Sequence, residues 1–119
     1  MRDSITAFQV SIVGSICYLA PELLPILQEH LDDYDGLLPH VMMGDITRWV
    51  IRKFNADRSD PTLRQVLTFI EDACSQADYE DRGIIIVSFI ENLPRIGEDD
   101  AEVRSLLGPS LLGELHKID

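Results

Sequence analysis

The residues of this 119-residue chain that could bind a metal ion begin with an acidic stretch, LDDYDGLLPHVMM. With Gly36 at the sixth position of an EF-hand loop, Asp33 and Asp35 take the third and fifth positions, which carry calcium ligands. The first and twelfth positions are then Leu31 and Met42, so two essential oxygen ligands are missing. We therefore expect no calcium site, no other metal site and no cofactor.

The chain has three histidines, and none belongs to an HxxxH or HExxH pattern that could hold zinc. His40 lies five residues before Asp45, a spacing that fits poorly on one helix face. A small enzyme or metal-dependent regulator built on these two residues and nearby acids is one hypothesis. A surface or capping role for the histidines is the simpler interpretation.

Nucleophilic catalysis finds no support in the sequence. No GxSxG, P-loop or GxGxxG motif occurs. Cys17 and Cys74 lie in apolar stretches without the neighbouring basic residues that would stabilise a thiolate. We expect buried free thiols in a reducing cytosol rather than a disulfide. These patterns predict a protein that is not an enzyme and has no small-molecule substrate.

Charge is the most informative bulk property. The chain carries 21 acidic and 10 basic residues, a net charge of −11. Such a field repels nucleic acid and attracts basic proteins. Solubility alone is the competing explanation for it. The acids fall into three groups that predict an acidic partner-binding face: Asp32, Asp33 and Asp35; Glu71, Asp72, Asp78, Glu80 and Asp81; Glu98, Asp99, Asp100 and Glu102.

Helical periodicity dominates the first half of the chain. Residues 4–19 repeat apolar side chains at three- and four-residue steps, with Asp3 or Ser4 as the expected cap. A second helix places Leu23, Leu24, Leu27, Leu31 and Tyr34 on one side and ends at Asp35-Gly36. A third helix starts near Pro39 and ends near Phe54, and Trp49 lies on its apolar stripe.

The second half is also predicted to be helical. Asp60-Pro61 is a strong helix start, followed by four turns of regular apolar spacing. Residues 83–93 contain β-branched residues in a row and could be read as a strand, but no partner strand exists for it. We expect a central helix there, then a short helix over residues 99–107 and a last one over residues 110–117.

These elements predict one all-α domain over residues 1–119, a bundle of about six helices or stacked helical hairpins. No stretch reaches the roughly 20 apolar residues that a membrane span needs. The apolar stretch near the N-terminus is interrupted by polar residues, so we expect no secretory signal. The expected location is the cytoplasm.

Three stretches, LLPHVMMGDITRW, IIIVSFIENLP and LLGPSL, carry a family resemblance. At these stretches the chain resembles a family of small, acidic, helical bacterial proteins found beside polymorphic toxins and contact-dependent growth inhibition systems. Proteins in that position serve as immunity proteins. The resemblance implies an immunity protein that inhibits one cognate toxin, and it implies no catalytic residue.

Charge and resemblance lead to the same hypothesis. Many delivered toxins are basic nucleases because they must grip anionic substrates. The leading hypothesis is therefore an immunity protein that binds a cognate toxin domain and occludes its active site or substrate groove. The alternative is a non-catalytic adaptor or structural subunit that binds a different protein through the same surface.

Overall fold

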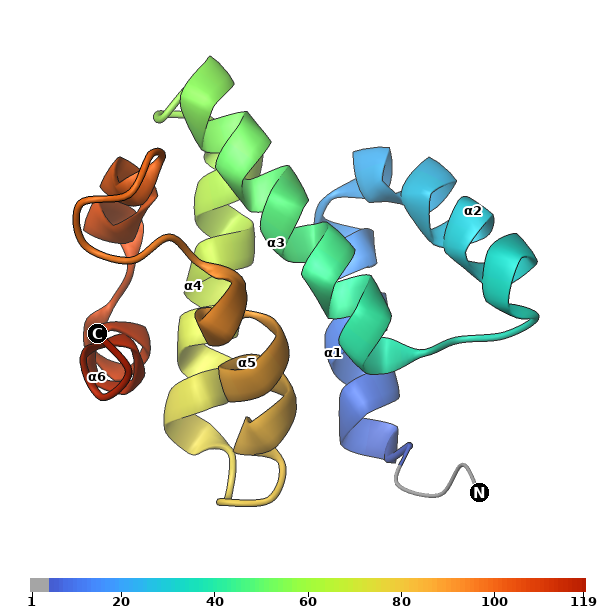
Figure 1. The fold of residues 1–119 in the computed structure, drawn as a ribbon. Coiled ribbons are helices and arrows are strands. Elements are labelled where there is room, and N and C mark those ends of the chain that lie inside the picture. Colours follow the sequence, from blue (N-terminus) through green and yellow to red (C-terminus); the bar gives the residue numbers. More distant parts are fainter. Residues whose placement is uncertain (1–4) are drawn as a thin grey trace.

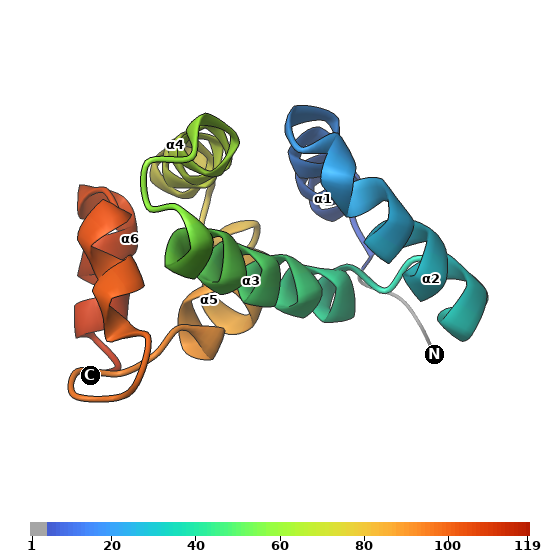
Figure 2. The same cartoon turned by 90° about the horizontal axis from the view of Figure 1, so that it is seen from above.

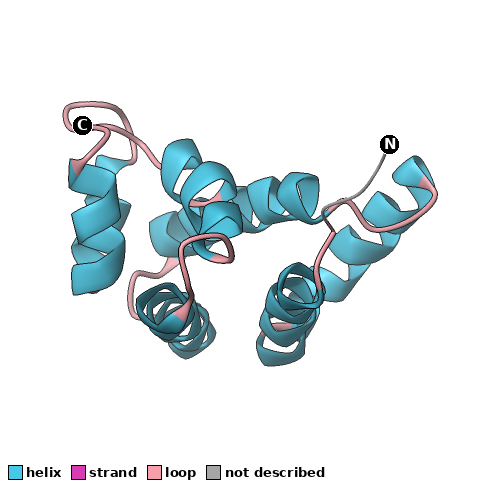
Figure 3. Ribbon diagram, turned by 90° about the horizontal axis from the view of Figure 1, so that it is seen from below, coloured by secondary structure: helices cyan, strands magenta, loops and turns pink. Residues whose placement is uncertain are grey.

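The computed structural model describes residues 5–119, which form six α-helices and three short 3-10 helices (Figure 1). Helices and loops, and no strand, make up these residues (Figure 3). The predicted all-α bundle is therefore confirmed. In chain order the elements are α1 (Ala7–Leu19), η1 (Pro21–Leu23), α2 (Leu24–Tyr34), α3 (Pro39–Ala56), α4 (Pro61–Gln76), α5 (Arg82–Ser88), η2 (Ile90–Asn92), η3 (Ala101–Leu106) and α6 (Pro109–His116).

Proline sets the start of three α-helices, because its fixed φ suits the first helical position and its missing N–H leaves no donor unpaired there. α3, α4 and α6 all begin this way. At α4 the predicted cap is confirmed, since Asp60 Oδ1 accepts the Leu63 N–H at 2.9 Å. That hydrogen bond, together with the Lys53 ammonium, lowers the pKa of Asp60.

The start of α1 differs from the prediction. Asp3 and Ser4, the expected caps, lie outside the described residues, and the observed N-cap is Thr6. Thr6 Oγ1 accepts the Gln9 N–H and Gln9 Oε1 accepts the Thr6 N–H, which completes a capping box. The helix consequently begins at Ala7, and Ile5 ahead of it is exposed rather than part of the buried face.

α2 is turned about its axis relative to the prediction. Leu24 and Tyr34 are about half exposed, whereas Leu23 and His30 are buried. The 3-10 turn η1 precedes α2, and its tighter winding shifts the phase of the residues that follow. The imidazole of His30 accepts the Leu38 N–H through Nε2 at 2.9 Å, which ties α2 to the start of α3.

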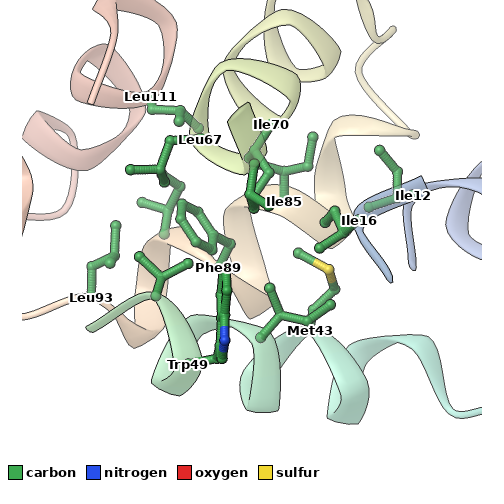
Figure 4. Close-up of a cluster of buried hydrophobic side chains, with 14 of the residues drawn as sticks. Ile12, Ile16, Met43, Trp49, Leu67, Ile70, Ile85, Phe89, Leu93 and Leu111 are labelled. Carbon is green, nitrogen blue, oxygen red and sulfur yellow. The ribbon is translucent and has the colours of Figure 1, made fainter. Parts of the chain in front are cut away.

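The core lies where α3 crosses α5, with α4 and α1 packed against them (Figures 1 and 2). Figure 4 shows Phe89 among side chains of α3 and α4, with Trp49, Leu67 and Ile70 around it. The expected core position of Trp49 is confirmed, because it is 4% exposed and donates through Nε1 to Glu22 Oε1 at 2.7 Å. α2 and α6 lie at opposite ends of the molecule.

Residues 83–93 are helical and central as predicted, but they do not form one continuous helix. α5 ends at Ser88, and a 3-10 turn follows over Ile90–Asn92. The Ser88 carbonyl accepts the Thr47 hydroxyl at 3.2 Å and the Asn92 side-chain amide at 2.7 Å. The backbone N–H of Asn92 bonds instead to the Phe89 carbonyl, three residues back, which tightens the chain into 3-10 geometry.

The last helix is held by an acidic side chain of α4. Both carboxylate oxygens of Glu71 accept backbone N–H groups at the start of α6, from Ser110 at 2.8 Å and from Leu111 at 3.0 Å. A carboxylate suits this place because the first N–H groups of a helix lack partners within the helix. Gly108 lets it approach, since a Cβ there would lie 2.5 Å from Glu71 Cδ.

Replacement of Phe89 by alanine should cost about 3–5 kcal/mol of unfolding free energy, because the ring is fully buried and its removal leaves a cavity. Urea denaturation followed by circular dichroism measures this loss. The exposed Val87, two residues earlier in the last turn of α5, is the control, and Val87→Ala should change stability by well under 1 kcal/mol. Equal losses from the two substitutions would contradict the packing of α5.

Gly108→Ala should destabilise the protein by about 1–2 kcal/mol, the usual value of a helix cap, because the new methyl group displaces Glu71. In a Glu71→Ala background the same substitution should have little further effect, since no cap remains to be lost. Gly113→Ala is the matched control: its Cβ would meet nothing within 4 Å, so it should stabilise α6. Additive losses in the double variant would show that Gly108→Ala does not act by displacing Glu71 from the start of α6.

Candidate functional site

Most of the predicted acidic residues share one property. Among the described residues, eleven of the twelve form no ion pair with a lysine, an arginine or a histidine, and the exception is Glu102, which pairs with Arg58. Ten of the eleven are exposed or half-buried on loops and helix ends, while Glu71 is occupied by the cap of α6. Glu71 therefore does not belong to the free acidic surface with which the sequence grouped it.

Most of the basic residues form ion pairs with acids outside the three groups. Six of the nine lysines and arginines in residues 5–119 form ion pairs, and five of their six acidic partners lie outside the three groups, while the sixth is Glu102 of the third group. The pairs are Arg48–Asp45, Lys53–Glu22 and Lys53–Asp60, Arg58–Glu102, Arg82–Glu114, Lys117–Glu114 and Arg104–Asp119. Apart from Glu102, the acids of the three groups are thus left without an ion pair.

The three groups do not form one face. The group at the end of α2 lies near the start of α3, whereas Asp100 accepts a hydrogen bond from Asn55 near the end of α3 at 2.9 Å. An 18-residue helix separates these places by about 27 Å. The turn between α4 and α5 occupies a third corner, at the bottom of Figure 1. A single small partner would therefore contact one group at a time.

The turn between α4 and α5 has the most defined geometry. Asp78 Oδ1 accepts the Asp81 N–H at 2.8 Å, and the Arg82 N–H bonds to the Asp78 carbonyl at 3.0 Å, so Asp78 shapes the turn. Glu80 is exposed and Asp81 is half-buried. Tyr79 lies between Asp78 and Glu80 with 91% of its surface exposed, more than any other large apolar side chain in residues 5–119.

Tyr79 is a residue that the sequence reasoning missed. Tyrosine is enriched among the anchor residues of protein interfaces, because its ring supplies area and its hydroxyl a hydrogen bond. The available signal was an aromatic residue between acids in a predicted turn. The structure adds that its ring has no packing role within the chain.

The other two groups are tied into the fold to different degrees. Glu98 accepts the Arg95 N–H at 2.7 Å, while Asp32 accepts from the Gln28 side chain at 3.0 Å. A hollow of about 440 Å³ opens beside Asp100, but Arg58 already lies over the Phe54 ring there, 4.9 Å from its centroid. The guanidinium of Arg58 therefore supplies positive charge in this hollow, so the hollow is not a vacant site for a partner's cation.

The candidate catalytic residues are not brought together. His40 lies with Nδ1 2.5 Å from the hydroxyl of the buried Ser88, and Asp45 pairs with Arg48 instead of His40. The structure thus forms a histidine–serine contact that the spacing did not predict. Ser88 is 3% exposed, so a substrate has no access to its hydroxyl.

Cys17 and Cys74 are free and buried, as expected, and burial raises the pKa of both thiols. A raised pKa leaves little thiolate at neutral pH, which disfavours nucleophilic or metal-binding roles. In residues 5–119 no cluster of three or more histidine, cysteine or acidic side chains is arranged to hold a metal ion.

No single helix between residues 5 and 119 is long and apolar enough to cross a membrane. α1 and the segment Pro21–Tyr34 reach that length and composition only together, and a bend of 114° separates them.

Comparison with known proteins places these features in a family. Neither a curated protein nor a solved structure matches the chain. A model described as a domain of unknown function, DUF7674, matches residues 15–119, which include all three acidic groups and begin within α1. Because the match covers most of its length, the chain belongs to the DUF7674 family.

Proposed function

We propose that this protein is an immunity protein, which binds a cognate toxin domain of basic character and occludes its active site or substrate groove. The observation that carries the proposal is the separation of charge. Five acids outside the three groups, together with Glu102, pair with most of the cations, and the other eleven predicted acids have no ion pair among the described residues. The resemblance to acidic bacterial proteins encoded beside polymorphic toxins supports the choice of partner.

Uncompensated acids favour a basic partner for two reasons. Their field accelerates encounter with a positively charged surface. In addition, a partner's arginine or lysine gains an ion pair without first displacing an internal cation. Occlusion needs no catalytic group on the inhibitor, so the proposal includes that the protein is not an enzyme. The buried free thiols fit the cytoplasm as the place of action.

The turn of Asp78, Tyr79, Glu80 and Asp81 is the contact surface that we propose. Acids flank an exposed ring there, which combines long-range attraction with a short-range anchor. The half-buried Arg82 next to the turn is directed inward, where it donates to the Ala77 carbonyl at 2.9 Å and lies 3.8 Å from Glu114. Its charge therefore contributes little to the outer side of the turn.

The association rate with the toxin domain encoded by the neighbouring gene tests the proposal. Raising the salt concentration from about 0.05 to 0.5 M shortens the Debye length from about 14 to about 4 Å. Association should slow by at least about tenfold, while dissociation, which is set by short-range packing, should change less. Stopped-flow fluorescence or surface plasmon resonance separates the two rates.

Charge-neutral variants locate the contact. The triple substitution Asp78→Asn, Glu80→Gln and Asp81→Asn keeps the acceptor that shapes the turn, so the fold should survive and association should slow. Asp32→Asn, Asp33→Asn and Asp35→Asn remove the same charge at another corner and should slow association less. Tyr79→Ala should mainly speed dissociation. The proposed surface would be contradicted by tight binding whose association and dissociation rates change neither with salt nor with any of these substitutions.

The biological arm of the test uses growth. Cells that express the toxin domain should survive when the wild-type chain is co-expressed and should die when the Asp78, Glu80 and Asp81 variant combined with Tyr79→Ala replaces it. Stable binding without protection from the toxin would favour the adaptor function. An absence of binding to the toxin domain would refute the immunity proposal.

A further inference from the structure

α2 is held to the rest of the fold by few buried side chains. Of its 11 residues only His30 is buried, whereas α1, which has 13 residues, buries four and α4 buries five. Ile26 and Leu27 pack against the core with part of their surface exposed. The helix lies at one end of the molecule and packs on η1 and α3 (Figures 1 and 2). A helix with so little buried surface opens at a low free-energy cost, so its attachment depends strongly on His30.

The hydrogen bond of His30 requires a neutral imidazole ring. Nε2 accepts the Leu38 N–H at 2.9 Å, so the proton of the neutral ring is on Nδ1. Nδ1 is buried and has no hydrogen-bond partner in residues 5–119. A protonated imidazole carries an N–H on both nitrogens and cannot accept a hydrogen bond. Protonation of His30 in the closed structure would therefore place two N–H donors against each other, the ring's and that of Leu38.

A positive charge on the buried ring would also lack a counter-ion. Among the described residues His30 forms no ion pair, and Tyr34 lies against its ring with the two centroids 5.0 Å apart. The titratable residues of η1 and of the first half of α3 have other partners: Glu22 with Trp49 and Lys53, His40 with Ser88, and Asp45 with Arg48. The acids of α2 itself are exposed to water: Glu29, Asp32 and Asp33. A buried charge without a partner is costly, so the closed position of α2 disfavours the protonated ring.

We propose that α2 is a pH-sensitive arm, which detaches from the start of α3 when His30 is protonated. Detachment brings the charged ring into water and frees the Leu38 N–H to bond with water. A histidine side chain in water gains its proton with a pKa of about 6.5. Because the closed arm binds the neutral ring, the closed state is most stable above about pH 6.5 and loses stability as the pH falls below that value. Opening exposes Ile26 and Leu27 and moves the acidic group at the end of α2.

Hydrogen–deuterium exchange of the α2 backbone amides measures this opening. At each pH the wild type is compared with His30→Gln, whose side-chain carbonyl keeps an acceptor for the Leu38 N–H and does not titrate. A comparison at one pH cancels the pH dependence of the exchange chemistry itself. The ratio of the wild-type to the variant exchange rate should rise about tenfold from about pH 7.5 to about pH 5.5, as linkage requires when a group of pKa about 6.5 takes its proton only in the open state. A ratio that stays constant would overturn the proposal.

Two controls separate an arm from a general loss of stability. His116→Gln replaces an exposed histidine at the end of α6, so its α2 amides should show the same rise as the wild type. The amides of α4 should keep their protection at both pH values, and an equal loss of protection in α4 would refute a local release of α2. If His30→Gln does not fold, the wild type decides alone: α2 exchange, divided by the intrinsic rate, should rise relative to α4 by the same factor. No toxin is present in this experiment, so it can fail independently of the immunity proposal.

Discussion

The structure depends on the apolar contact between α3 and α5, which are adjacent in space but separated by more than 20 residues of chain. Phe89, Met43 and Ile85 are fully buried there, and α1 and α4 pack around them. The Thr47 hydroxyl and the Asn92 amide satisfy the Ser88 carbonyl inside this contact. A buried carbonyl without partners would be costly, so these polar side chains make the end of α5 compatible with burial.

Local signals predicted the helices well and their interactions poorly. The Asp60-Pro61 start and the buried stripe of α3 were correctly predicted, because caps, prolines and apolar periods act within one or two turns. The break after Ser88 was not, since it depends on Thr47, 41 residues earlier. The burial of His30 also escaped prediction, because its partner is a backbone N–H beyond the end of α2.

The same limit applies to the candidate site. The numbers of acidic and basic residues can be read from the sequence, and they correctly indicate an acidic protein. Which of these residues form ion pairs or hydrogen bonds depends on the fold. Glu71 looked like any other acid in its group, yet it caps a helix 39 residues later and makes glycine necessary at position 108. Tyr79, by contrast, has no partner that could have been predicted; it differs from Tyr34 in its greater exposure and because Tyr34 packs against the His30 ring.

The distribution of charge has a physical consequence for the proposed contact surface. At physiological ionic strength the Debye length is about 8 Å, well below the 27 Å or so between the ends of α3. Each acidic group therefore acts almost alone, which limits their mutual repulsion in the folded chain. The net charge still opposes self-association through any acidic corner. A strongly acidic surface of this kind favours basic partners at each corner separately, rather than across one continuous face.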